Sequence, residues 1–276
     1  MKFAVRISYL GKNYCGWQKQ KENAAPLPSI QETLEKTLSK MTEESISVVG
    51  SGRTDAGVNA VGQVFHFRVA NPRFTAEIFR RGLNSMLPQD IRVMDAREVP
   101  ASFHAQISAT HKQYSYYFQQ GSCALPHLMD TTWWIQKTLD VEAMRTALNA
   151  LVGEHDFKPF QASGAPPDRS TVRKILEAEV TREMMPVFPG VDLNERGYSV
   201  VRVRIVGTGF LKQMVRGIAG TLLQIGEGRR PAEDMGVILK TLDRSKVGAT
   251  APSKGLTLER VWYKPDLYEY KCGNPD

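Results

Sequence analysis

Apolar and polar residues alternate at the start of the chain, over residues 2–8, which predicts a β-strand. Apolar residues then recur at helical spacing from residue 30 to residue 41, behind a capping box formed by Ser29 and Glu32. The rest of the first part predicts, in order, a strand at 46–50, a Gly-rich loop at 50–62, a strand at 63–69, a helix at 76–86 and a strand at 91–98. The predicted order is therefore β-α-β-β-α-β.

The second part of the chain repeats this order. Its elements are a short strand near 131–136, a helix at 141–151, strands at 172–181 and 198–206, a strongly apolar helix at 210–225, a helix that begins at Pro231, and a closing strand at 256–263. Two split β-α-β patterns predict an α+β protein with two ferredoxin-like units, whose mostly antiparallel sheets join around a central cleft. We place the N-terminal unit at residues 1–110 and the C-terminal unit at 111–276, with a boundary between about 103 and 125.

The composition is that of an ordinary globular protein, but the charge is not neutral. Of the 276 residues, 42% are hydrophobic and 24% are charged. The net charge is +7 and the sequence pI is about 9.3. Both halves are net basic, so we expect a polyanionic partner that contacts both of them.

The cysteines and histidines do not indicate a metal site or a disulfide framework. Cys15, Cys123 and Cys272 lie far apart, and the five histidines are scattered. The His-x-Glu and Pro-Cys-x-x-Cys elements of a zinc deaminase are missing. The N-terminus alternates instead of forming an apolar block, and no apolar run is long enough to span a bilayer. We expect a cytoplasmic protein without a metal or an organic cofactor.

The most informative segment is the Gly-rich loop GSGRTDAGVNAVGQ, residues 50–63. One interpretation is a plain turn, in which Asp55 caps its own backbone and Gly57 supplies a positive φ. The loop is unusual in having four glycines between residues 50 and 62, which let its backbone come close to something bulky. Asp55 is therefore a candidate functional carboxylate.

Six segments together resemble one family. The run GRTDAGV at 52–58 is similar to the signature of the tRNA pseudouridine synthase A (TruA) family. The other similar segments are YLGKNYCGWQKQ at 9–20, the stretch 103–116 that leads into a Tyr-x-Tyr strand, GEHDFKPF at 153–160, FLKQMVRGIAGTLL at 210–223 and TAPSKGLTLERVWY at 250–263. The resemblance spans nearly the whole chain.

This resemblance implies an isomerase that cleaves the C1′–N1 glycosidic bond of uridine, turns the uracil and rejoins it through C5. Asp55 matches the catalytic aspartate, Tyr114 the active-site tyrosine and Arg216 the active-site arginine. Periodicity alone favours other roles, because Tyr114 lies in an aromatic stripe with Tyr116 and Phe118, and Arg216 lies opposite an apolar helix face. In the family reading, Tyr114 contacts the uracil, and the planar fork of Arg216 bonds Asp55 at two points. Tyr116 and Phe118 remain core residues.

Four further residues are candidates for binding the substrate. Arg53 is either a phosphate contact or a plain surface charge. Asn59 stands where the family commonly has His, and Gln106 where an Arg often occurs, so both are expected to touch RNA. Lys212 shares the basic face with Arg216. The resemblance also implies a homodimer that acts on the anticodon arm of tRNA, at positions 38 to 40.

Three alternatives stay open from the sequence. The first is a member of the same family with a different or broader RNA target. The second is a non-catalytic RNA-binding protein on the same scaffold. The third is a carboxylate-pair hydrolase, although no second acid is recognisable near Asp55. Segment 183–197 is longer and more apolar than a plain hairpin, and the sequence gives it no function.

Overall fold

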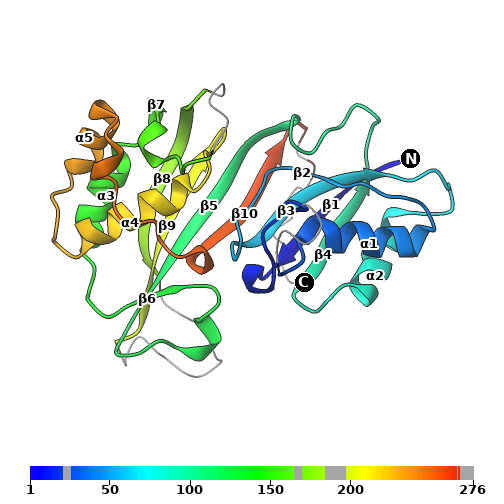
Figure 1. The fold of residues 1–276 in the computed structure, drawn as a ribbon, viewed down its shortest axis with the longest axis horizontal. Coiled ribbons are helices and arrows are strands. Elements are labelled where there is room, and N and C mark those ends of the chain that lie inside the picture. Colours follow the sequence, from blue (N-terminus) through cyan, green and yellow to red (C-terminus); the bar gives the residue numbers. More distant parts are fainter. Residues whose placement is uncertain (21–25, 165–169, 184–196, 266, 268–276) are drawn as a thin grey trace, which may run out of the picture.

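The computed structural model describes residues 1–20, 26–164, 170–183, 197–265 and 267. Over these residues the chain forms an α+β protein built on one ten-stranded sheet, in the order β4-β1-β3-β10-β5-β9-β8-β7, with β2 paired to β3 and β6 paired to β5. Figure 1 shows β5 and β10 in the middle of the molecule, with α1 and α2 at one end and α3, α4 and α5 at the other. The predicted α+β class and the mostly antiparallel sheet are confirmed.

Among its described residues, the first half contains four strands and two helices. They are β1 (Lys2–Tyr9), α1 (Ile30–Thr42), β2 (Val49–Gly50), β3 (Asn59–Arg68), α2 (Ala76–Met86) and β4 (Ile91–Glu98). The Ser29 hydroxyl caps α1 by accepting a hydrogen bond from the Glu32 N–H at 3.1 Å, as predicted. The predicted strand at 46–50 is reduced to two residues, and β3 begins at Asn59 instead of residue 63.

Helices α1 and α2 cover an aromatic core on the sheet of the first half. Phe3 on β1 and Phe67 on β3 both meet Phe79 of α2 edge-on, with ring centroids 4.9 and 4.8 Å apart. All three rings are buried, as are Leu34 and Leu38 of α1. The alternation along β1 and the helical spacing in α1 therefore bring one apolar face of each element into the same core.

The second half contains six strands and three helices among the described residues. They are β5 (Ala109–Gln120), β6 (Trp133–Ile135), α3 (Val141–Asn149), β7 (Gly153–Asp156), β8 (Val172–Glu183), β9 (Ser199–Gly207), α4 (Met214–Gly226), α5 (Asp234–Thr241) and β10 (Leu256–Tyr263). Segment 183–197 lies, apart from its two end residues, outside the described part of the chain.

One prediction for the second half is confirmed and one is wrong in detail. The short strand predicted near 131–136 is β6, Trp133–Ile135, which pairs with the end of the long strand β5. The apolar helix begins at Met214 and not at residue 210, because Gln213 takes a left-handed conformation with φ of 58° that helical residues do not adopt. Residues 212–213 form a turn ahead of α4.

Both halves arrange their principal strands in the same order. In the first half β4, β1 and β3 are neighbours and β2 pairs with β3; in the second half the order is β10, β5, β9 and β8. All these pairs are antiparallel. The halves meet where β3 and β10 run parallel over two residue pairs, Asn59 with Thr257 and Ala60 with Leu258. This short junction places the part of the Gly-rich loop that precedes Asn59 between the two halves.

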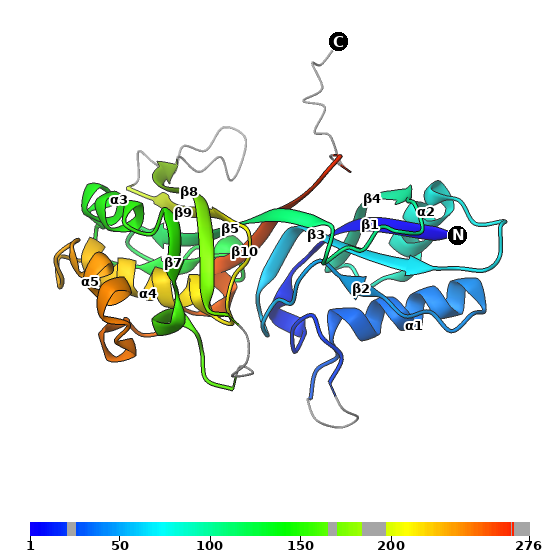
Figure 2. The same cartoon turned by 90° about the horizontal axis from the view of Figure 1, so that it is seen from above.

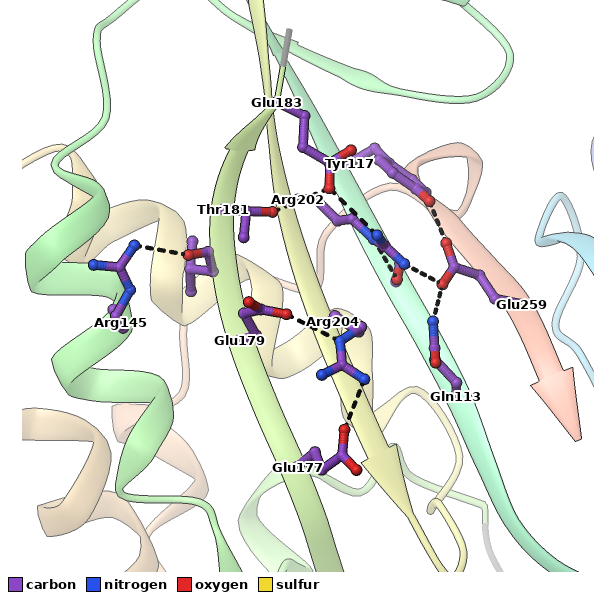
Figure 3. A network of polar contacts seen from close by, with 12 residues as sticks. Gln113, Tyr117, Arg145, Glu177, Glu179, Thr181, Glu183, Arg202, Arg204 and Glu259 are labelled. Atoms are coloured by element: carbon purple, nitrogen blue, oxygen red, sulfur yellow. Dashed lines mark hydrogen bonds and ion pairs between the residues drawn. The ribbon is translucent and has the colours of Figure 1, made fainter. Parts of the chain in front are cut away.

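The sheet of the second half carries a polar network, shown in Figure 3. Arg202 on β9 bonds Glu259 on β10 at 2.6 Å and Glu183 on β8 at 3.3 Å, and Arg204 pairs with Glu177 and Glu179 on β8. Along β9 these arginines alternate with the buried Val201, Val203 and Ile205. Strand alternation therefore separates a charged face from the apolar face of this sheet.

Within the described residues, no helix has the length and the apolar character needed to cross a membrane.

Candidate active site

The loop between β2 and β3, residues 51–58, is fixed at its start by strand β3. The Ser51 N–H donates to the Val64 carbonyl at 2.7 Å, and the Ser51 hydroxyl donates to the Gln63 side-chain oxygen at 2.6 Å. The Gln63 amide then donates to the Gly52 carbonyl at 3.0 Å. Ser51 and Gln63 are both fully buried. The loop therefore starts from a rigid base, although its glycines make it flexible in isolation.

The N-terminal segment 9–17 packs directly against this loop. The Trp17 N–H donates to the Thr54 carbonyl at 3.0 Å, and the hydroxyls of Tyr9 and Thr54 lie 2.8 Å apart. Gly16 has a φ of 106°, and a Cβ added there would lie 2.7 Å from the Thr54 carbonyl oxygen. Such a close backbone approach admits only glycine. The Gly-Trp spacing in segment 9–20 thus serves to hold the residue next to Asp55.

Asp55 and Arg216 form an ion pair across the two halves. The Asp55 carboxylate lies 3.5 Å from Nη1 of Arg216, and the side chains are 31% and 15% exposed. Nε of Arg216 donates instead to the Ala251 carbonyl at 2.7 Å. The Ala251 N–H donates back to the Arg216 carbonyl at 3.1 Å. The predicted two-point bond to Asp55 is therefore wrong: the fork divides its contacts between Asp55 and the backbone of residue 251.

The backbone of the loop forms the turn that the sequence suggested, while the side chain of Asp55 forms the ion pair with Arg216. Gly57 has a φ of 74°, and the Val58 N–H donates to the Asp55 carbonyl at 3.1 Å. This is a tight turn in which glycine is required. The turn leaves the Asp55 carboxylate beside Arg216. Turn geometry and a chemical role are thus compatible in the same residue.

Tyr114 lies on β5 close to this pair and is only 7% exposed. Its ring meets Phe210 edge-on at 5.0 Å. Burial raises the pKa of Tyr114 far above its usual value, and the nearby Tyr9 and the Asp55 carboxylate raise the pKa further. The Tyr114 hydroxyl is therefore neutral at physiological pH, and it can donate a hydrogen bond but cannot serve as a phenolate base.

The other two residues of the aromatic stripe are core residues, as predicted. Tyr116 and Phe118 are fully buried, with ring centroids 4.9 Å apart. The Tyr116 hydroxyl donates to the Pro252 carbonyl at 2.8 Å, next to the carbonyl that binds Arg216. Tyr116 thus helps to hold the segment that positions Arg216.

The candidate substrate-binding residues differ in their surroundings. Arg53, Gln106 and Lys212 are exposed, and the Lys212 ammonium lies 3.3 Å from the Ser163 carbonyl. All three are available to a partner.

Asn59 is only 3% exposed, and its side chain is used inside the protein. It accepts from the Gly11 N–H at 2.8 Å and donates to the carbonyls of Asp130 at 3.0 Å and Lys254 at 2.9 Å. These bonds join three distant segments at the β3–β10 junction. The geometry gives Asn59 a structural role, and an RNA contact by its amide has no support from its position.

Sequence reasoning overlooked Lys112, which lies on the same strand two residues before Tyr114. Its ammonium donates to the Ser51 carbonyl at 2.6 Å, at the start of the Asp55 loop. Burial lowers the pKa of Lys112 to about 8. The available signal was a lysine in phase with Tyr114, Tyr116 and Phe118 on a strand whose inward face is otherwise aromatic.

A pocket near the β3–β10 junction is separate from this site, and the described residues include no cluster of metal ligands. Among the residues that the structure describes, no three His, Cys, Asp or Glu side chains gather as metal ligands. A pocket of about 200 Å³ is bordered by Asp90, Arg92, Thr131 and Thr257, and its lining does not include Asp55, Tyr114 or Arg216. The candidate chemistry rests on the loop, β5 and α4.

The chain is similar to a known family over most of its length. A sequence model of the family described as tRNA pseudouridine synthase matches residues 6–106 and 147–264. The protein named tRNA pseudouridine synthase A from Syntrophotalea carbinolica is 40% identical over 259 residues, which cover 94% of this chain and 95% of the relative. Its namesake from Thermoanaerobacter sp. is 38% identical, with coverage of 94% and 98%. A protein named tRNA pseudouridine synthase A 2 from Clostridium tetani is 34% identical, with coverage of 94% and 97%.

The matched ranges contain two of the three candidate catalytic residues. Asp55 and Arg216 lie inside them, whereas Tyr114 and Lys112 lie in the interval 107–146 that the family model leaves out. The relatives cover this chain almost end to end.

Proposed function

The chain belongs to the tRNA pseudouridine synthase family, and from this premise we propose that it isomerises uridine to pseudouridine in the anticodon arm of tRNA, at positions 38 to 40, with Asp55 as the catalytic carboxylate. The observation that carries the proposal is the contact between Asp55 and Arg216. It joins a carboxylate from the loop of the first half to a cation from the helix of the second half, at 3.5 Å. A turn residue without chemistry has no need of such a partner.

The three residues have distinct roles in the proposed reaction. Asp55 serves it either by stabilising or trapping the cationic sugar, or by moving a proton, once the C1′–N1 bond breaks. Arg216 orients the carboxylate, because its own position is fixed by the Ala251 backbone. Tyr114 offers a buried ring on which the uracil stacks and a neutral hydroxyl that donates a hydrogen bond.

RNA binding in this proposal is mainly electrostatic and involves both halves. The target base must leave its stack, because its glycosidic bond is otherwise shielded. Arg53, Gln106 and Lys212 are exposed side chains from the two halves that contact the RNA. The net charge of +7 supports a polyanionic partner. We place the reaction in the cytoplasm and take the active protein to be a homodimer, as the family resemblance implies.

We also propose that the halves are two ferredoxin-like units, residues 1–110 and 111–276, joined around the site. The repeated strand order of the two halves supports this interpretation. The boundary then falls near the start of β5, Ala109–Gln120, and most of this strand, with Tyr114, belongs to the second unit. Asp55 comes to the junction of the units from the loop before β3 of the first unit.

The proposal is tested by incubating the protein with unmodified tRNA transcripts and mapping pseudouridine by position. We expect pseudouridine in the anticodon arm with the wild type and none with Asp55→Asn, while tRNA affinity changes little. The variant removes one charge but leaves the phosphate contacts. Pseudouridine elsewhere in the tRNA would refute the proposed target. Turnover by Asp55→Asn above a few per cent of wild type would refute the role of Asp55.

A further inference from the structure

Lys112 connects the strand of Tyr114 to the loop of Asp55. Its side chain leaves β5 on the same face as Tyr114, because side chains two residues apart on a strand share a face. Its ammonium donates to the carbonyl of Ser51, a residue with no exposed surface, at 2.6 Å. A charged donor makes this bond stronger than an ordinary amide–carbonyl bond.

The bond differs from the other contacts that hold the start of the loop, residues 51 and 52, in the strand from which it comes. Gln63 and Val64, which hold Ser51 and Gly52, belong to β3, the strand into which the loop itself runs. Lys112 belongs to β5, and β10 lies between β5 and β3 in the sheet. The Lys112 contact therefore spans the junction between the halves.

We propose that Lys112 is a positioning residue that sets the Asp55 loop relative to Tyr114, a role that rests on the proposed function of the site. Asp55 and Tyr114 approach the same substrate from different halves, and their separation depends on how the halves are tied together. The β3–β10 pairing contains only two residue pairs. The hydrogen bond from Lys112 to the loop adds a second connection and restricts the distance between Asp55 and Tyr114. Small errors in the placement of catalytic groups lower rates steeply.

The surroundings of Lys112 favour a positioning role over a stabilising one. Burial lowers the pKa of Lys112 to about 8, which means that the buried ammonium is destabilised by the loss of its hydration. In the described part of the chain no carboxylate lies within ion-pair distance of its ammonium. An apolar side chain of similar length would not require the desolvation of a charge, so fold stability alone does not explain a lysine at this position.

Gly52 provides a second way to disturb the same contact. A Cβ added at Gly52 would lie 2.9 Å from Nζ of Lys112 and 3.7 Å from its Cε. These atoms form the end of a flexible side chain, so Gly52→Ala displaces the ammonium without a backbone clash. It keeps the lysine and its charge.

The experiment compares Lys112→Met, Gly52→Ala and the double variant with wild type. Lys40→Met, which removes an exposed lysine from the last turn of α1, is the matched control. The readouts are the single-turnover rate at saturating enzyme, the dissociation constant for tRNA, and hydrogen exchange at residues 53–57 without RNA. We expect Lys112→Met to lower the rate by about 10- to 100-fold, to leave the dissociation constant within about threefold, and to speed up exchange in the loop.

Gly52→Ala should act in the same direction with a smaller effect, and the double variant should be no slower than Lys112→Met, because both changes break one contact. Lys40→Met should match wild type in every readout. Unchanged rate and loop exchange in Lys112→Met would overturn the proposal. Weaker tRNA binding at an unchanged rate would also overturn it, because Lys112 would then be a phosphate contact.

The exchange measurement separates this proposal from the proposed function. The exchange measurement requires no substrate. Faster exchange of the loop in Lys112→Met and Gly52→Ala would therefore show that the Lys112–Ser51 contact restrains the loop, even if wild type makes no pseudouridine. Gly52→Ala retains every other side chain, so it keeps the test decisive if Lys112→Met fails to fold.

Discussion

Replacement of Arg216 by lysine tests whether the reaction needs both contacts of the guanidinium, to Asp55 and to the Ala251 carbonyl, and not only its positive charge. Arg216 holds the Ala251 carbonyl with Nε at 2.7 Å and faces Asp55 with Nη1 at 3.5 Å. Lysine has one nitrogen in place of these two, so it keeps one contact and loses the other. A hydrogen bond to a charged group contributes about 1.5–3 kcal/mol. If all of it acts in the transition state, the rate falls by about 10- to 150-fold.

The assay is the single-turnover rate at saturating enzyme, measured with tRNA affinity and the melting temperature. Arg229→Lys is the matched control, because Arg229 follows the same helix, is 54% exposed and pairs only with Glu227 among the described residues. We expect both variants to melt within about 3 °C of wild type, which corresponds to about 1 kcal/mol for a protein of this size. A rate for Arg216→Lys within about threefold of wild type would show that charge alone is sufficient, and the argument from geometry would be wrong.

Three further predictions concern stability and the loop. Burial lowers the pKa of His66 to about 4, below its unfolded value near 6.5, so its contribution to stability is complete above pH 6.5 and is lost as pH falls toward 4. Urea unfolding at pH 7 and pH 4.5 should show a loss of at most about 3 kcal/mol that shrinks in His66→Gln. Gly16→Ala should slow turnover, because its Cβ lies 2.7 Å from the Thr54 carbonyl beside Asp55; a normal single-turnover rate in this variant would contradict the packing argument. Glu259→Gln should lower the free energy of unfolding by about 1–3 kcal/mol, because it weakens the 2.6 Å pair with Arg202, and should leave the single-turnover rate unchanged.

The elements that the sequence predicted best are those whose boundaries are set locally. Helix α2 and strand β4 have the predicted bounds, 76–86 and 91–98. Thr75 caps the helix, since its hydroxyl accepts from the Ile78 N–H at 3.3 Å, and Pro88 follows its end. Periodicity and caps need only neighbouring residues, so they can be recognised in a single sequence.

The boundaries that were wrong depend on distant partners. Strand β3 begins at Asn59 because that residue pairs with Thr257, and its amide bonds the Lys254 carbonyl at 2.9 Å. Helix α4 begins after Gln213, whose left-handed backbone ends the turn that carries Phe210 to the ring of Tyr114. Neither partner can be found from hydrophobic periodicity.

The same distinction explains the candidate site. Asp55 and Tyr114 were identified by resemblance to a family, while their local patterns favoured a turn and an aromatic stripe. Both local readings hold, because the loop is a turn and Tyr114 is almost fully buried. Asn59 shows where the resemblance was misleading: its departure from the family's His suggested an RNA contact, but its amide bonds Gly11, Asp130 and Lys254. A local pattern states which backbone a residue adopts, and only the fold states which group its side chain meets.

The Asp55 side chain contacts the protein on one side and is exposed to solvent on the other. On the protein side, Arg216 and Tyr114 are largely buried, and the Ala251 carbonyl holds the guanidinium of Arg216. Figure 2 shows the two halves meeting at β3 and β10. On the other side the Asp55 side chain keeps 31% of its surface exposed. A reaction that detaches a base, turns it and reattaches it needs a fixed charge and room for the base at the same place. A carboxylate that is held from one side and open on the other meets both needs.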